Sequence, residues 1–189
     1  MSSEEKKSIF KIRKATYDDV SALAILHVKT FNETHGINPN GPTYELRLLQ
    51  WSQAFKDMEA TWFCFVIESK SGGLIGFAKG QPYNHIEFSE YSGELNKIYL
   101  LRKYQKQGLG RKLMSEVVDE FLRQGITSML LFGDANNPSN RFYERMGGEK
   151  LFAKNGEFHG GYGWKDLQKF QFIRSSSRDS NSYEYFEQQ

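Results

Sequence analysis

The chain of 189 residues lacks the features that would assign it at once to a specialised class. Its one cysteine, Cys64, cannot form an internal disulfide, and it lies in the apolar run Trp62–Ile67, which favours a buried small side chain over a nucleophile. No stretch approaches the roughly 18 apolar residues of a membrane-spanning helix, and the polar segment Met1–Lys7 lacks the apolar part of a signal peptide. We therefore expect a soluble, cytoplasmic protein without disulfides.

Strong charge and metal-ligand patterns are also missing. The formal net charge is +2 at pH 7 and the basic residues are not clustered, so the sequence indicates neither a nucleic-acid partner nor a membrane surface. The four histidines show no ligand spacing, and a single cysteine excludes a CxxC pair. We therefore expect no metal site.

Apolar residues are abundant enough for a substantial core, since they make up 39% of the chain and include 15 Phe and 10 Tyr. The length suits one domain, which we place at residues 9–173. Residues 1–8 are predicted to be a flexible N-terminus, and the polar segment 174–189 is predicted to be a disordered tail.

Hydrophobic periodicity predicts an order of strands and helices. The first helix begins with the start signal Thr16–Asp19, and the second has Leu46, Leu49 and Phe55 among its apolar positions. The predicted order is β-α-α-β-β-β-α-β-α-β-β. Strands are expected at 9–13, 62–68, 74–80, 94–101 and 128–132, helices at 108–123 and 138–146, and two final strands within 149–153 and 165–173.

The most informative segment runs from Tyr104 to Met114, where a strand turns through two glycines into a helix. A helix start leaves backbone N–H groups without partners, and with the positive end of the helix dipole they form a site for phosphate oxygens. Gly108 and Gly110 would let the backbone close on the anion without a Cβ in the way. We therefore expect a phosphate-bearing cofactor here; the alternative is a glycine-rich turn that only opens a helix.

The spacing of the glycines separates the competing phosphate loops. A Walker-type loop needs G-x-x-x-x-G-K-[ST], but Gly110 is followed by Arg-Lys-Leu. A dinucleotide loop needs G-x-G-x-x-G, but Leu113 occupies the place of the third small residue. What remains is Q-x-x-G-x-G, formed by Gln105, Gly108 and Gly110.

This pattern resembles the acetyl-coenzyme-A loop of the GNAT (Gcn5-related N-acetyltransferase) superfamily. Residues 136–148 resemble a second family pattern, N-x-x-A-x-x-F-Y-x-x-x-G-F, with Ser139 in place of alanine and Gly148 in place of the last aromatic, which leaves a packing gap. The matching positions are Asn136, Phe142, Tyr143 and Gly147. The resemblance covers roughly residues 9–172. It implies an α/β fold with a mixed, mostly antiparallel sheet of about six or seven strands and about four helices.

The resemblance implies acetyl-coenzyme A as co-substrate. The loop amides around Gln107–Gly110 would bind the pyrophosphate, and the pantetheine arm would lie against the preceding strand like an added strand. Asn136 would contact the pantetheine amides; the alternative is a turn residue before Pro138. The expected cofactor-binding residues are Ile98, Tyr99, Leu100, Gln105, Lys106, Gln107, Gly108, Leu109, Gly110, Arg111, Asn136 and Tyr143.

The resemblance also implies an N-acetyltransferase in which a primary amine attacks the thioester directly. Tyr143 matches the family tyrosine that protonates the leaving thiolate, although an aromatic packing role is the alternative. Glu94 lies at the offset from Gln105 at which histone-type members carry their catalytic glutamate. A strand glutamate paired with Lys97 is an equal alternative, and many members use a water chain instead.

The acceptor stays open among small amines, polyamines, antibiotics, and protein or peptide amines. Glu87, Glu90 and Glu94 favour a cationic acceptor slightly. Family members often pair through their last strands, so a homodimer is one option. A non-catalytic acyl-coenzyme-A-binding module is the alternative function, and the presence of Tyr143 argues against it.

Overall fold

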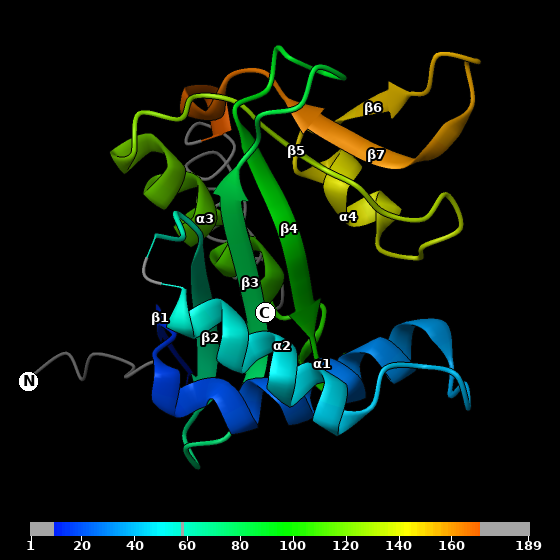
Figure 1. Cartoon of the computed structure of the whole chain (residues 1–189). Helices are drawn as coiled ribbons and strands as arrows, with labels where there is room; N and C mark the ends of the chain where they lie inside the picture. Colours follow the sequence, from blue (N-terminus) through cyan, green and yellow to red (C-terminus); the bar gives the residue numbers. More distant parts are fainter. Residues whose placement is uncertain (1–9, 58, 171–189) are drawn as a thin grey trace, which may run out of the picture. The chain divides into compact units, whose positions relative to one another are not determined.

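The structure, a computed structural model, describes residues 10–57 and 59–170 (Figure 1). The predicted flexible N-terminus and disordered tail lie outside the described residues. The main elements follow the predicted order, which confirms the fold prediction. They are β1 (Phe10–Lys14), α1 (Val20–His35), α2 (Tyr44–Lys56), β2 (Phe63–Ser69), β3 (Leu74–Pro82), β4 (Gly93–Leu100), α3 (Leu109–Arg123), β5 (Met129–Leu131), α4 (Asn140–Arg145), β6 (Glu149–Phe152) and β7 (Phe158–Trp164), with 3-10 turns at Tyr17–Asp19 and Arg102–Tyr104.

The seven strands hydrogen-bond in the order β1-β2-β3-β4-β5-β7-β6. The pairs β1–β2, β5–β7 and β6–β7 are antiparallel, whereas β4 and β5 are parallel, with Gly93 opposite Met129 and Glu94 opposite Leu130. The described residues form two compact units: unit 1 includes residues 10–79, apart from 58, and 97–113, and unit 2 includes residues 80–96 and 114–170.

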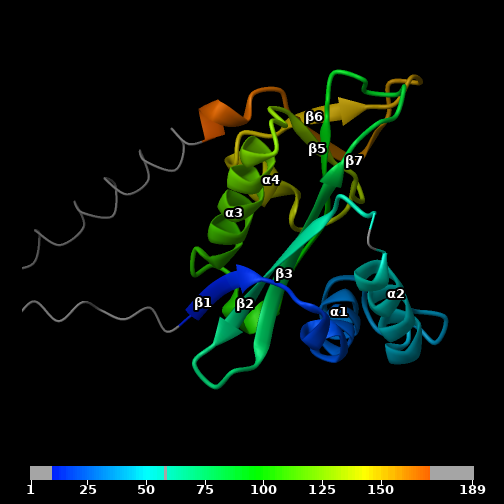
Figure 2. The ribbon, with the colours of Figure 1, turned by 60° about the vertical axis from the view of Figure 1, so that its left-hand side comes forward.

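In unit 1, α1 and α2 lie side by side, as both ribbon views show (Figures 1 and 2). His27 on α1 packs its ring against Phe77 of β3 and Tyr99 of β4, at centroid distances of 5.2 and 5.3 Å. Trp51 on α2 also contacts Phe77, at 5.6 Å. The two helices are therefore anchored to this part of the sheet by aromatic rings.

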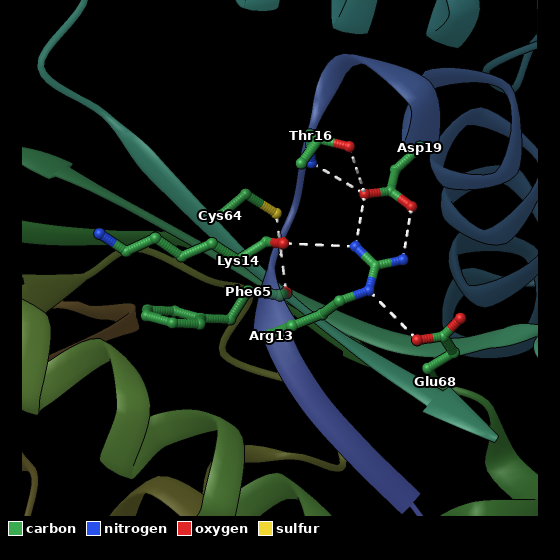
Figure 3. Close-up of polar contacts among 7 residues, drawn as sticks. All are labelled: Arg13, Lys14, Thr16, Asp19, Cys64, Phe65 and Glu68. Atoms are coloured by element: carbon green, nitrogen blue, oxygen red, sulfur yellow. Dashed lines mark hydrogen bonds and ion pairs between the residues drawn. The ribbon is translucent and has the colours of Figure 1, made fainter. Parts of the chain in front are cut away.

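Arg13 of β1 ties three elements of unit 1 together (Figure 3). Its guanidinium donates two hydrogen bonds to the Asp19 carboxylate, at 2.7 and 2.8 Å, and its Nε donates to Glu68 of β2 at 3.1 Å. Asp19 also accepts a bond of 2.8 Å from the Thr16 backbone N–H. The Arg13 guanidinium beside Asp19 holds the pKa of that carboxyl below its usual range.

The apolar face predicted for α2 is wrong in part. Leu46 is 45% exposed and Leu49 is 54% exposed, whereas Trp51 is 4% exposed. The inward positions of the helix follow the spacing 47, 51 and 55, so Arg47 stands where the periodicity would require an apolar residue. Its guanidinium lies over the ring of Phe31 on α1, with Cζ 5.9 Å from the ring centroid.

In unit 2 the last predicted strand is also wrong. β7 occupies Phe158–Trp164, before the predicted range 165–173, and residues 167–170 are helical; residues 171–173 lie outside the described part. Leu167 and Phe170 are buried as helix residues, which explains why their apolar spacing was read as a strand.

Close packing explains the glycines of β7. A Cβ at position 163 would lie 2.3 Å from the Tyr91 hydroxyl oxygen, and a Cβ at position 160 would lie 2.4 Å from the backbone carbon of Asp134. These glycines therefore allow neighbouring groups to approach the strand, although a run of glycines alone is typical of a loop.

Candidate active site

The glycine loop of unit 1 has the strand–turn–helix form that the sequence predicts. β4 ends at Leu100, a 3-10 turn covers Arg102–Tyr104, and α3 begins at Leu109. Gly108 is left-handed with φ +76°, and Lys106 is also left-handed with φ +59°, a conformation that is strained for a residue with a side chain. A Cβ at position 108 would meet no heavy atom within 4 Å, so the space beside the loop is open to that depth.

The start of α3 is suited to an anion. Lys112 donates its N–H to the Gly108 carbonyl at 3.1 Å, which closes the first turn of the helix. The first N–H groups of an α-helix have no carbonyl one turn earlier in the helix to bind. The first turn of α3 has no acidic residue, although an acid is favoured at that position. Residues 102–112 include five basic side chains and no acidic one. The helix end and the side chains therefore both favour a bound anion.

Two glutamine side chains hold the loop to its own backbone. Gln105 Nε2 donates to the Leu100 carbonyl at 3.1 Å, and Gln107 Nε2 donates to the Lys103 carbonyl at 3.2 Å. The N–H of Leu101 donates to Ile75 of β3 at 3.0 Å, which fixes the end of the strand. The structure thus gives Gln105 a positioning role that the sequence pattern does not reveal.

In unit 2, the Glu94 carboxylate is held on both oxygens. Gln81 Nε2 donates to Oε2 at 2.8 Å, and Asn96 Nδ2 donates to Oε1 at 3.0 Å. The side chain is half-buried, so its remaining lone pairs can accept a proton or a water. Alternation along a strand places residues 94 and 96 on one face, so Asn96 could have been found from the sequence. Gln81 lies on β3, 13 positions before Glu94 in the sequence, and only the fold brings the two side chains together.

The segment after β5 in unit 2 is shaped by asparagine and aspartate side chains. The Asn140 amide donates to the carbonyls of Asp134 and Ala135, at 3.0 and 2.9 Å, and Asp134 Oδ1 accepts from the Asn136 N–H at 2.7 Å. Asn136 itself is exposed. Asn140 is therefore the residue that holds this turn, a role that the sequence pattern does not reveal.

Tyr143 lies on α4 and is 7% exposed. Its ring packs against the rings of Phe142 and Tyr162, both at 5.5 Å. The Tyr162 hydroxyl donates to Glu144 at 3.1 Å, and burial is the main cause that raises the pKa of Tyr162 to about 12. Tyr162 therefore remains a neutral phenol that supports Tyr143, and its place in an unpredicted strand is why sequence reasoning missed it.

The packing gap expected at Gly148 is filled by Trp164. A Cβ at position 148 would lie 2.7 Å from Cζ2 of the Trp164 indole, so only glycine fits there without a shift. The indole Nε1 donates to the Met146 carbonyl at 2.8 Å. The indole of a β7 residue thus lies directly against position 148.

The described residues also bear on three expectations from the sequence, which concern the cysteine, membrane-spanning helices and metal sites. Burial raises the pKa of the Cys64 thiol, and the side chain is 3% exposed, which confirms a buried small residue. Within residues 10–57 and 59–170, no helix is long and apolar enough to cross a bilayer. The same residues hold no cluster of three or more His, Cys, Asp or Glu side chains suited to a metal ion.

Comparisons with known sequences support the resemblance. The sequence profile of the Acetyltransferase (GNAT) family matches residues 25–148. The uncharacterised N-acetyltransferase YuaI of Bacillus subtilis (strain 168) is 32% identical over 169 residues, which cover 86% of this chain and 96% of the relative. A phosphinothricin N-acetyltransferase of Streptomyces viridochromogenes is 26% identical over 176 residues, which cover 89% of this chain and 90% of the relative.

Solved structures share the fold. The structure of yncA of Salmonella typhimurium with its cofactor acetyl-CoA has a TM-score of 0.62 and 22% identity, over 85% of this chain and 95% of that one. The paia N-acetyltransferase of Thermoplasma acidophilum, in complex with coenzyme A, has a TM-score of 0.62 and 18% identity, over 82% and 97%. With the family profile and the 32% identical relative, the chain belongs to the GNAT family of acetyltransferases.

Proposed function

We propose that this protein transfers the acetyl group of acetyl-coenzyme A to a primary amine, which attacks the thioester carbonyl directly. The observation that carries the proposal is the loop of Gln105–Leu109, where two left-handed residues lead into a helix whose first turn contains no acid. Family membership supports the same reaction. We assign the activity to one domain, residues 9–173.

The loop would hold the pyrophosphate through its backbone. Backbone N–H groups of Gln107–Gly110 would bind the phosphate oxygens, because oriented amides and the helix dipole act on the same anion. Lys106 would belong to the same site, and Arg111 would add positive charge beside the loop. A backbone site of this kind depends on conformation more than on side-chain identity. The left-handed Gly108 and the open space beside it are therefore its two requirements.

The backbone of Ile98, Tyr99 and Leu100 would pair with the pantetheine arm, as an added strand pairs with the edge of a sheet. Asn136 would bind the amides of the same arm. Its exposed side chain and the turn that Asp134 and Asn140 hold in place support that assignment.

When bound, acetyl-coenzyme A supplies a thioester whose C–S bond breaks as the amine nitrogen bonds to the carbonyl carbon. Tyr143 would donate its phenolic proton to the leaving sulfur, and Glu94, directly or through water, would accept the proton that the amine loses. Gln81 and Asn96 hold the Glu94 carboxylate in a fixed orientation, which a proton acceptor needs. Tyr162 supports the Tyr143 ring on one side.

A thiol-release assay tests this proposal. Purified protein is mixed with acetyl-coenzyme A and a panel of primary amines, and free coenzyme A is measured against a sample without amine. Amine-dependent thiol release supports transfer, and mass spectrometry should find the acetylated amine. If the protein binds coenzyme A but releases no thiol with any amine, the non-catalytic binding module is the better description. Sedimentation of the same sample tests whether the protein is a homodimer, which the sequence leaves open.

A further inference from the structure

The last turn of α1 and the first residues after β4 bind each other in both directions. The backbone N–H of Arg102 donates to the Glu33 carboxylate, with 2.7 Å between N and Oε2. The Arg102 guanidinium donates back through Nη2 to the Glu33 backbone carbonyl. The two residues are 69 positions apart in the sequence, and both belong to unit 1. We call this reciprocal pair of hydrogen bonds the Glu33–Arg102 clamp.

Each bond of the clamp serves a backbone group at the end of a helical element. α1 ends at His35, so the Glu33 carbonyl lies in the last turn, where carbonyls have no N–H one turn later to bind and where the helix dipole favours a cation. Arg102 opens the 3-10 turn after β4, and the first N–H groups of such a turn need an outside acceptor. Leu101, at the N-cap position of that turn, has no side-chain oxygen to offer. The Glu33 carboxylate therefore caps the turn from another element.

The clamp acts at the point where the chain enters the glycine loop. Gln105 donates its N–H to the Arg102 carbonyl at 3.1 Å, and its Nε2 donates to the Leu100 carbonyl at 3.1 Å, so the turn is rigidly tied to its own start. The left-handed Lys106 follows directly, and then the amides of Gln107–Gly110. A backbone anion site works only if its N–H groups converge on one point. The direction that the clamp gives to the chain is therefore passed on to these amides.

The charge of Glu33 gives the clamp a property that can be tested. Residues 102–112 include five basic side chains and no acidic one, and Glu33 brings a carboxylate to this segment from α1. On charge alone, an acid here opposes the binding of a pyrophosphate. Removal of the acid would then strengthen binding, whereas removal of a positioning group would weaken it. The two explanations predict effects of opposite sign.

We propose that Glu33 is a positioning residue for the co-substrate: through Arg102 it holds the entrance of the glycine loop in the conformation that binds the pyrophosphate. This inference rests on the proposed acetyl-coenzyme A site and names a residue outside the loop on which that site depends. Glu33 acts through the backbone of Arg102 and not on the reacting atoms. Its effect therefore falls on the affinity for the donor and not on turnover once the donor is bound.

Calorimetry with coenzyme A, which needs no transfer, tests the proposal. Glu33→Ala should weaken binding by about tenfold, the lower range for loss of a hydrogen bond to a charged group. Glu33→Gln keeps an acceptor oxygen at the same reach and should stay within about threefold of the wild type. Glu33→Asp keeps the charge but is one methylene shorter, so it should resemble Glu33→Ala. Glu59→Ala, at an exposed turn position after α2, makes the same change elsewhere in unit 1 and should bind like the wild type.

Two results of this series overturn the proposal. Binding in Glu33→Ala that equals or exceeds that of the wild type would mean that Glu33 does not position the loop. Equal losses in Glu33→Gln and Glu33→Ala would mean that the charge decides, and not the place of the acceptor oxygen. Hydrogen exchange checks the clamp itself: the Arg102 amide should exchange at least about tenfold faster in Glu33→Ala than in the wild type or in Glu33→Gln.

A donor without the pyrophosphate separates positioning from a general loss of structure. The initial slope of thiol release gives kcat/KM without saturation. With acetyl-coenzyme A it should fall about tenfold in Glu33→Ala, while kcat at saturation stays within about twofold. With S-acetylpantetheine, which lacks the pyrophosphate, kcat/KM should be the same in Glu33→Ala and the wild type. Equal falls for both donors would indicate a structural defect and contradict the assignment.

The binding series also separates this inference from the proposed function. If the predicted order of affinities is found but no amine is acetylated, Glu33 positions the loop of a coenzyme-A-binding module and the transfer reaction is wrong. If amines are acetylated and Glu33→Ala binds coenzyme A like the wild type, the acetyltransferase stands and the role of Glu33 is wrong. If the wild type does not bind coenzyme A at all, both are wrong.

Discussion

The glycine loop of unit 1 and strand β7 of unit 2 both depend on glycine, for opposite reasons. Gly108 is left-handed and a Cβ there would meet nothing, whereas Gly163 is part of a strand and a Cβ there would strike the Tyr91 ring. The first glycine shapes the backbone beside open space, and the second lets the protein's own side chain come close. In the proposed reaction, unit 1 would contribute a main-chain site, and unit 2 would contribute side chains that packing holds in place.

The largest effect is expected from a side chain of unit 2. Tyr143→Phe should lower kcat by about 10²–10⁴-fold, the usual contribution of a general acid, with little change in the affinity for acetyl-coenzyme A. The thiol-release assay gives kcat, and calorimetry gives the affinity for acetyl-coenzyme A. Tyr91→Phe is the matched control, because it removes a buried hydroxyl of the same unit that has no partner among the described residues. Equal losses of turnover and affinity in Tyr143→Phe would indicate a packing role.

The main-chain site of unit 1 is tested by Gly108→Val. A β-branched residue cannot adopt φ +76° without strain, and its side chain would project beside the loop, so we expect at least about 100-fold weaker binding of acetyl-coenzyme A. Gly72→Val, at φ +84° in the turn after β2, adds the same backbone strain away from the loop and should keep full affinity. Calorimetry that finds equal affinity in both variants would refute the loop assignment. Gly110→Glu, which puts an acid into the first turn of α3, should also abolish binding.

The close packing of β7 predicts a loss of stability. Gly163→Ala places a methyl group 2.3 Å from the Tyr91 hydroxyl, so we expect the free energy of unfolding to fall by about 1–3 kcal/mol. Gly161→Ala, where the nearest atom would be 3.3 Å away, should cost less. Denaturant unfolding measures both, and the double variant Tyr91→Ala with Gly163→Ala should show coupling between the two positions. Additive losses in that double variant would mean that Tyr91 is not the obstacle.

The smallest effect concerns a side-chain pair in unit 1. Asp19→Asn weakens the double hydrogen bond with Arg13 and should lower the free energy of unfolding by about 1–2 kcal/mol at pH 7. Because the folded-state pKa of Asp19 is lowered, this contribution is complete above the unfolded-state value near 4 and is lost as the pH falls through the folded value. The difference between wild type and variant should therefore shrink in acid.

Asp18→Asn is the control for that experiment, because Asp18 is the exposed neighbour of Asp19 in the same turn. Its unfolding free energy should follow that of the wild type at each pH. A difference between Asp19→Asn and wild type that stays constant from pH 7 to strong acid would contradict a stabilising charge on Asp19.

The same contrast explains which parts were predictable from the sequence. The loop and the order of elements were predictable because a left-handed turn before a helix requires particular residues within a short stretch, such as Gly108. β7 was not predictable, because its glycines are required by the close approach of Tyr91 and Asp134, which are distant in the sequence. The residue that fills the gap at Gly148 was missed for the same reason, since Trp164 belongs to β7.

Arg47 shows a different limit. Its position on the inward face of α2 breaks the apolar period, and periodicity read from the sequence placed Leu46 and Leu49 inside instead. The desolvation cost of a charged residue at an inward position must be offset by other interactions of the protein or by a ligand. Such a break in the apolar period is therefore itself a signal of function. The catalytic roles proposed for Tyr143 and Glu94 rest on the family resemblance alone, because a buried tyrosine or a strand glutamate is common in any fold.

The most direct test of the central claim is a crystal structure of the protein soaked with acetyl-coenzyme A. Our account predicts pyrophosphate oxygens within hydrogen-bond distance of the backbone nitrogens of Gln107–Gly110, with the thioester directed toward the Tyr143 hydroxyl. A map in which the loop stays empty while the co-substrate binds elsewhere would contradict it.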